Sequence, residues 1–279
     1  MNTRLIVVGG FLGSGKTTLL WEAAQRLATR GLRVGLITND QAPELVDTVF
    51  LSRSGCKVKE VNGSCFCCNF NGLIDALSAL RSETSADVLI AEPVGSCTDL
   101  SATIIQPLKA RLPHDLEVSP LSVLVDPLRL IDILNGGTSG LHPSAAYIFR
   151  KQIEEADVIV VNKADLLIPT ELETLRARLT HTFPGTTVFT TSTETGEGIN
   201  PWLDEMMLRT DTGQRIAEVD YEIYAEGEAV LGWLNATMIL HGKVTDWNFF
   251  AKRLLNNMSL RFAQDACGYW SCQTHSRIQ

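Results

Sequence analysis

Gly10-Phe11-Leu12-Gly13-Ser14-Gly15-Lys16-Thr17 decides the fold of this 279-residue chain. The stretch follows an apolar run and opens a helical pattern, and in that setting G-x-x-x-x-G-K-[ST] is typical of a P-loop rather than of a turn that binds nothing. Its glycines let backbone N–H groups turn around phosphates, and the helix N-terminus adds partial positive charge. We expect Lys16 to contact the β- and γ-phosphates and to act in catalysis, and Thr17 to ligate Mg²⁺. The residues expected to hold a nucleotide here are Gly10, Gly13, Ser14, Gly15, Lys16, Thr17 and Thr18.

Apolar runs alternate with helical patterns over the first two hundred residues, which is typical of βα units around a parallel sheet. Most of the runs are rich in Val, Ile and Leu without alternation, as expected when both faces of a sheet are covered. We therefore predict an α/β, P-loop three-layer αβα domain with a mostly parallel sheet over residues 1–210. The expected strands are 4–9, 33–38, 57–61, 87–92, 120–126, 157–162 and 186–191. The expected helices are 16–30, 73–81, 99–111, 144–155, 171–181 and 200–208.

The pattern of apolar and polar residues changes after a polar linker at residues 209–215. Val219, Tyr221 and Ile223 alternate with acids, residues 230–240 form a second extended stretch, and apolar residues recur at helical spacing from Trp247. We predict a small C-terminal α+β domain over residues 216–279. Its apolar helix face packs into its own core or, alternatively, serves a client or a second copy of the chain.

Composition limits the classes of function. With 45% apolar and 20% charged residues the chain has material for a buried core, and its net charge of -8 gives no general field for nucleic acid or an anionic membrane. No apolar run approaches the roughly 18 residues that span a bilayer, and no small-residue cleavage site follows the apolar start before Lys16. The seven cysteines are odd in number, and three crowd into four residues where structural disulfides form poorly. We expect reduced thiols and a cytoplasmic protein.

A motif at the end of a strand can determine which base the nucleotide site binds; it reads Asn162-Lys163-Ala164-Asp165. A carboxylate at Asp165 accepts from the two adjacent N–H groups of guanine and meets no such donors on adenine, so GTP is favoured over ATP. A polar loop can produce this short pattern by chance. Its place on the last strands, ahead of a loop in which Ser192 would close over the base, favours the base-binding interpretation.

Three acids end strands on the expected edge of the sheet: Asp40, Glu92 and Asp126. Glu92-Pro93-Val94-Gly95 has a glycine three residues after the acid, which suits a backbone N–H that meets the γ-phosphate and a loop that moves after hydrolysis. We expect Glu92 and Asp40 in catalysis and in the Mg²⁺ shell, and Gly95 at the nucleotide. Asp126 precedes a proline and is either a helix cap or a ligand.

Cys65, Cys67 and Cys68 place three soft ligands between a strand and a helix. The helix dipole favours thiolate, the form that binds metal, and three sulfurs leave a fourth position for water, a nucleotide-dependent side chain or a partner protein. Small buried hydrophobes are the alternative. Cys56 and Cys97 are either core residues or a fourth ligand. The pattern does not choose among Zn²⁺, Co²⁺, Ni²⁺ and Cu⁺.

Taken together, the P-loop, the Cys65-x-Cys67-Cys68 triplet, Glu92-x-x-Gly95 and Asn162-Lys163-x-Asp165 resemble, in order, the CobW family of P-loop GTPases, relatives of the HypB and UreG nickel chaperones. The resemblance implies a GTP-hydrolysing metallochaperone or insertase. GTP and Mg²⁺ set the shape of the cysteine loop, the thiolates bind a transition metal (Zn²⁺ first, Co²⁺ or Ni²⁺ next), and hydrolysis couples to delivery to a client metalloprotein. We also consider a homodimer and, from the charge and apolar runs above, expect neither nucleic acid nor a membrane as a partner.

The sequence departs from that family at three places. Asn39-Asp40-Gln41-Ala42 stands where many members have Asn-Glu-Phe-Gly, Ser192-Thr193 replaces Ser-Ala, and the C-terminal region is short and lacks a histidine-rich stretch. Two other functions are weighed. A P-loop kinase or transferase would need an acceptor pocket and a catalytic base and leaves the guanine motif without a purpose. A GTP-switched binding module would turn over negligibly.

Overall fold

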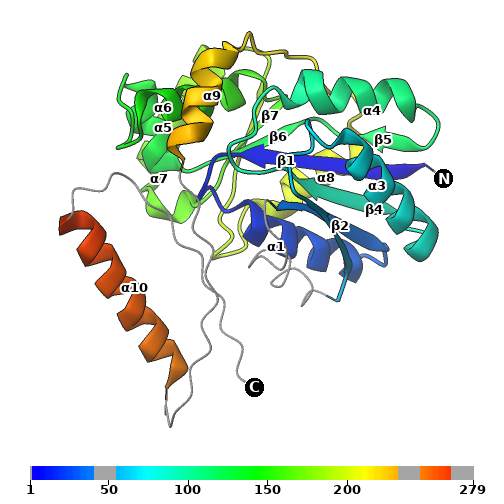
Figure 1. Cartoon of the computed structure of the whole chain (residues 1–279), viewed down its shortest axis with the longest axis horizontal. Helices are drawn as coiled ribbons and strands as arrows, with labels where there is room; N and C mark the ends of the chain where they lie inside the picture. Colours follow the sequence, from blue (N-terminus) through cyan, green and yellow to red (C-terminus); the bar gives the residue numbers. More distant parts are fainter. Residues whose placement is uncertain (1, 41–54, 232–245, 265–279) are drawn as a thin grey trace.

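The computed structural model describes residues 2–40, 55–231 and 246–264 of the chain (Figure 1). Within these residues an eight-stranded sheet runs in the order β3-β2-β4-β1-β6-β7-β8, with the short β5 also paired to β1, and every pairing is parallel. The chain winds outward on both sides of β1, so the carboxyl ends of the strands beside it form a crevice for ligands. The strands are β1 Thr3–Gly10, β2 Val34–Asp40, β3 Lys57–Asn62, β4 Val88–Glu92, β5 Leu116–Val118, β6 Ser122–Val125, β7 Val158–Val161 and β8 Thr187–Thr190.

Helices cover both faces of the sheet and form two apolar cores (Figure 1). Leu19 of α1 and Trp202 of α8 pack on one face, and α3 to α7 supply the larger core on the other. The three-layer prediction is confirmed. The helices are α1 Lys16–Thr29, α3 Phe70–Thr84, α4 Gln106–Arg111, α5 Pro127–Leu134, α6 Pro143–Glu154, α7 Pro169–Thr182, α8 Ile199–Leu208, α9 Tyr221–Val230 and α10 Trp247–Gln264, with the π-helical turn η2 Ser101–Ile105 and the 3₁₀ turn η3 Ala164–Leu166.

All seven expected strands and all six expected helices of the first 210 residues are present, with ends shifted by a few residues. Among the described residues, strand β5 and helix α5 were not predicted. The three-residue β5 is too short to show a period, and α5 begins at a proline after Asp126, whose Oδ1 accepts from the N–H groups of Leu128 and Arg129. Asp126 is therefore a helix cap, one of the two roles left open for it.

The strand expected around residues 219–223 is wrong, because this segment starts helix α9. The Asp220 carboxylate caps the helix by accepting from the N–H groups of Glu222 and Ile223. Gly227 then lies so close to α6 that an added Cβ would sit 2.7 Å from the Ser144 carbonyl oxygen. The helix expected from Trp247 is confirmed as α10. Residues 232–240 of the second extended stretch lie outside the described part, and the division into two domains stays a prediction.

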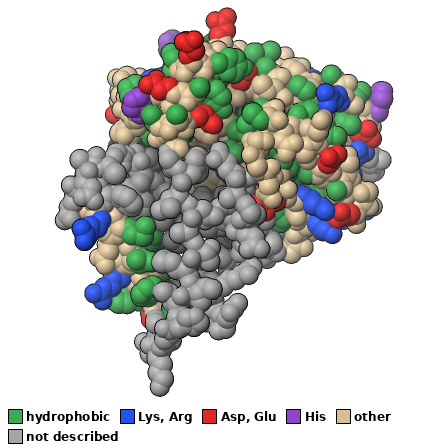
Figure 2. Space-filling view, viewed as in Figure 1, with side chains coloured by type: hydrophobic (Ala, Val, Ile, Leu, Met, Phe, Trp, Pro, Cys, Tyr) green, Lys and Arg blue, Asp and Glu red, His purple; other side chains and the backbone are tan. Residues whose placement is uncertain are grey.

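The described surface is mixed in character. Acidic side chains gather over α6 and α9 on the face shown in Figure 2. Among the described helices, none combines the length and the low polarity that a bilayer crossing needs.

Candidate nucleotide and metal sites

The P-loop wraps the start of α1 at the carboxyl end of β1. Gly10, Gly13 and Gly15 have φ angles of 130°, 76° and 93°, which residues with side chains rarely adopt. A Cβ on Gly10 would lie 2.3 Å from the Leu124 carbonyl oxygen, and one on Gly15 would lie 2.4 Å from Nδ2 of Asn162. The glycine pattern is therefore required by close backbone approach as well as by φ.

Lys16, Thr17 and Glu92 meet below this loop. The Thr17 hydroxyl donates to Oε1 of Glu92 over 3.0 Å, and the Lys16 ammonium lies 3.9 Å from the same oxygen. All three side chains are buried, and the buried Ser14 hydroxyl has no hydrogen-bond partner among the described residues. A hydroxyl and a carboxylate side by side are the oxygen ligands that Mg²⁺ takes, and an orphaned hydroxyl in a cradle of N–H groups suits a phosphate. The residues fit a magnesium nucleotide.

The guanine motif reaches the P-loop through its first two residues. Asn162 donates to the Ser14 carbonyl over 2.9 Å, and Lys163 donates to the Gly13 carbonyl over 2.7 Å and to Asp126 over 2.9 Å. Burial acts to raise the pKa of Asp126, but hydrogen bonds from Lys163 and the Arg129 N–H outweigh it and lower that pKa. Asp126 thus has a second task, since it holds Lys163 against the P-loop.

Asp165 and Ser192 lie together where the base is expected. The buried Ser192 hydroxyl donates to Oδ1 of the exposed Asp165 over 2.5 Å and accepts from the Thr195 N–H over 3.1 Å. The loop after β8 therefore orients the carboxylate that would face the base. Thr18 is exposed at the first turn of α1, beside the rest of the expected nucleotide residues.

Gly95 lies against the P-loop, and its expected contact with the nucleotide stays a prediction. An added Cβ would be 3.2 Å from the Leu12 N and 2.7 Å from Cδ2 of its side chain. The buried Gln152 of α6 donates to the carbonyls of Gly95 and Cys97 over 3.0 and 2.8 Å, so these hydrogen bonds hold the loop against α6.

The loop continues to a buried carboxyl at the end of α6. Glu155 accepts from the Ser101 N–H over 2.9 Å, and burial raises its pKa to about 8. The adjoining η2 is a π-helical turn, a form that is frequent at functional sites.

The three sulfurs of Cys65, Cys67 and Cys68 come together, with their sulfur atoms within 4.8 Å of one another. Sγ of Cys67 lies 2.7 Å from that of Cys65 and 3.9 Å from that of Cys68. Hydrogen bonds from the thiols of Cys67 and Cys97 lower the pKa of Cys65, so the cluster favours one thiolate. The buried Cys97 lies against this cluster, whereas Cys56 packs with the core on the opposite face of the sheet.

Asn39 shapes the cysteine loop, a role that was not predicted from the sequence. Its side-chain amide donates to the carbonyls of Val61 and Ser64 over 2.9 and 2.8 Å, and its Oδ1 accepts from the Phe66 N–H over 2.6 Å. The next residue, Asp40, ends β2, and its side chain lies outside the described part, so its expected role stays a prediction.

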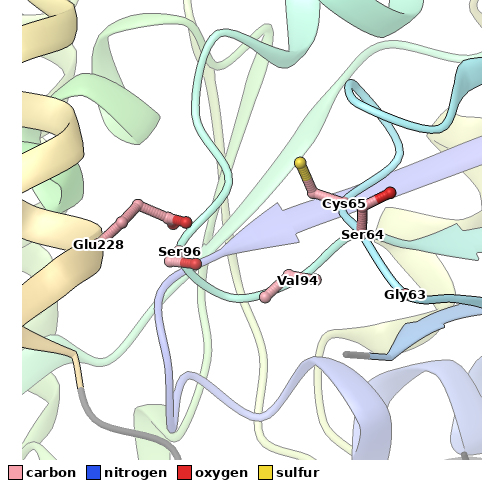
Figure 3. A pocket seen from close by; sticks show the side chains of 6 residues that line it. All are labelled: Gly63, Ser64, Cys65, Val94, Ser96 and Glu228. Atoms are coloured by element: carbon pink, nitrogen blue, oxygen red, sulfur yellow. The ribbon is translucent and has the colours of Figure 1, made fainter. Parts of the chain in front are cut away.

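A second unpredicted feature is a pocket of about 350 Å³ beside the thiols (Figure 3). The cysteine loop forms one wall, the Gly95 loop the floor, and Glu228 of α9 the far wall. The pocket is lined by Gly63, Ser64, Cys65, Val94, Ser96 and Glu228.

Residues 4–190 match the family model described as "CobW/HypB/UreG, nucleotide-binding domain". The chain belongs to this family. The crystal structure of HypB from Helicobacter pylori in complex with nickel shares the fold, with a TM-score of 0.51 and 17% identity over 74% of this chain and 86% of that one.

Curated relatives agree with that assignment. The zinc chaperone YeiR of Escherichia coli is 29% identical over 62% of this chain and 50% of its own. A zinc chaperone CobW of Sinorhizobium is 28% identical over 61% and 53%, and zinc-regulated GTPase metalloprotein activator 1 of Dictyostelium discoideum is 24% identical over 64% and 43%. The chain thus spans about half the length of the curated relatives it matches.

Proposed function

We propose that this protein is a GTP-hydrolysing metal chaperone that carries a transition ion, zinc first, on Cys65, Cys67 and Cys68 and delivers it to a client protein. The observation that carries the proposal is that the thiol cluster and the P-loop share one short segment. Glu92 contacts Thr17 at the start of the segment, and Cys97 lies against the thiols at its end.

The P-loop residues fit a GTP triphosphate, and Thr17 with Glu92 fits its Mg²⁺. The metal supplies charge neutralisation on the phosphates when it is bound. Lys16 adds a positive charge at the same place, and Gly95 offers its N–H beside the P-loop. Asp165 supplies the negative charge that distinguishes guanine from adenine. Zinc suits three thiolates, and the names of the curated relatives favour it over cobalt and nickel.

Nucleotide choice tests the first half of the proposal. Purified protein with Mg²⁺ should bind and slowly hydrolyse GTP in preference to ATP, and Asp165→Asn should move that preference towards xanthine nucleotides. Equal binding of ATP and GTP would refute the base assignment. Formation of a phosphorylated small molecule instead of free phosphate would favour the kinase alternative.

Metal affinity tests the second half. Replacing Cys65, Cys67 and Cys68 with Ser should abolish tight zinc binding, while Cys56→Ser, on the opposite face of the sheet, serves as the matched control. If the triple variant competes for zinc as well as the wild type does, the thiols are core residues and the chaperone function fails. Transfer of zinc to an apo-metalloprotein, with GTP and with GDP, separates a chaperone from a switch that only binds a client.

A further inference from the structure

The pocket beside the thiols is wider than a metal site alone requires. Its volume of about 350 Å³ is far more than the roughly 30 Å³ that one water molecule takes in the liquid. Cys65 lies on one wall, with the sulfurs of Cys67 and Cys68 within 4.8 Å of its own, and Glu228 projects from α9 on the other (Figure 3). A direct bond from Glu228 to an ion on the sulfurs would leave most of this space unused.

Glu228 presents an acceptor that nothing in the described chain satisfies. Its Oε1 is buried and has no hydrogen-bond partner among the described residues. Leaving a buried carboxylate oxygen without a donor is unfavourable by a few kcal/mol. The position is fixed by packing, because the adjacent Gly227 lies against the Ser144 carbonyl and Tyr221 of the same helix donates to Asp99.

The three sulfurs leave one position open on a tetrahedral ion. Imidazole is the common nitrogen ligand of zinc, and a ligating imidazole almost always donates its other N–H to a carboxylate or carbonyl. From the ion through the ring to an acceptor oxygen, this arrangement spans about 7 Å. An imidazole side chain can fill the open position and also supply the donor that Oε1 of Glu228 lacks, and the pocket is large enough to hold the ring.

We propose that the pocket receives a histidine side chain of the client. One ring nitrogen takes the fourth position on the metal held by Cys65, Cys67 and Cys68, displacing water, and the other donates its proton in a hydrogen bond to Oε1 of Glu228. Glu228 is thus a positioning residue for metal transfer. The client forms its first bond to the metal before the thiolates dissociate from it. The inference rests on the proposed function, since it takes the thiols as the metal site.

Free imidazole, titrated into the full-length protein loaded with Co²⁺, is the probe. Cobalt reports its ligands by absorption, with thiolate charge-transfer bands for the sulfurs and d–d bands for the fourth ligand. We expect saturable imidazole binding in the wild type, binding weaker by about tenfold or more in Glu228→Gln because a charged acceptor is lost, and wild-type behaviour in Glu226→Gln. Glu226 is exposed on the same helix and loses the same charge, which makes it the matched control.

Three results would overturn the proposal, and they are distinguishable. Equal imidazole affinity in the two glutamine variants, with thiolate bands intact, removes the role of Glu228 and leaves the proposed function standing. A loss of cobalt affinity in Glu228→Gln before imidazole is added makes Glu228 a direct ligand instead. Absent thiolate bands in the wild type overturn the metal site itself and the pocket proposal with it.

Discussion

Replacing Asn39 with alanine should loosen the cysteine loop without touching a cysteine. The side chain is buried and makes three hydrogen bonds, two to carbonyls and one from the Phe66 N–H. A neutral hydrogen bond contributes about 1 kcal/mol net, and a buried N–H left without an acceptor adds to the loss. We expect Asn39→Ala to lower the free energy of unfolding by about 3 kcal/mol.

The same change should weaken zinc binding by about tenfold or more, because supports behind metal ligands contribute on that scale. Urea unfolding followed by tryptophan fluorescence gives the first quantity, and competition with a chromophoric chelator gives the second. Asn62→Ala is the control, since Asn62 is exposed at the end of the neighbouring strand and should change stability by less than about 0.5 kcal/mol. If Asn39→Ala behaves like Asn62→Ala in both assays, Asn39 does not organise the loop.

Three further changes have expected outcomes. Ser192→Ala removes the hydrogen bond that orients Asp165 and should weaken GTP binding by about fivefold to tenfold in calorimetry, with ATP binding unchanged. The pKa of Glu155, about 8 in the folded protein, lies above its unfolded value, so the stability that this group contributes is complete below about pH 4 and is lost as the pH rises to 8. This loss is at most about 1.4 kcal/mol per pH unit. Urea unfolding at several pH values should show a smaller decline in Glu155→Gln. Gly227→Ala should push α9 away from Ser144 and speed proteolysis of that helix; an unchanged cleavage rate would show that α6 yields instead.

The sheet and its functional edge could be predicted because two strong signals coincide. Strands buried on both faces appear as continuous apolar runs, and the P-loop, Glu92 and Asn162 each stand at the end of one of them. In a parallel sheet, the carboxyl ends of strands share an edge, so the P-loop, Glu92 and Asn162 had to lie together. In the structure, Glu92 is hydrogen bonded to Thr17 of the P-loop and Asn162 to the carbonyl of Ser14.

Residues that act across the fold gave no such signal. Asn39 reaches Phe66 only because β2 and β3 pair with Asn39 opposite Val61, and a register between strands is not written in either strand alone. Helix α9 was mistaken for a strand because a five-residue alternation of apolar and acidic residues also suits a helix with exposed apolar side chains, and Tyr221 is in fact 60% exposed. The segment forms a helix because Asp220 caps it and because it packs closely against α6. Periodicity in the sequence reports neither the cap nor the packing.

The segment from Glu92 to Cys97 runs from the candidate nucleotide site to the candidate metal site. Its first residue contacts Thr17, Gly95 touches Leu12 of the P-loop, and Val94 and Ser96 line the pocket beside the thiols. A γ-phosphate that repositions Gly95 would strain or break the hydrogen bonds from Gln152 and move the floor of the pocket. Coupling of this kind is reciprocal. If a non-hydrolysable GTP analogue changes zinc affinity by some factor relative to GDP, zinc must change the ratio of analogue affinity to GDP affinity by the same factor. Calorimetry with the ligands added in both orders measures these factors. Equal zinc affinity with either nucleotide would show that this segment does not transmit the state of the nucleotide.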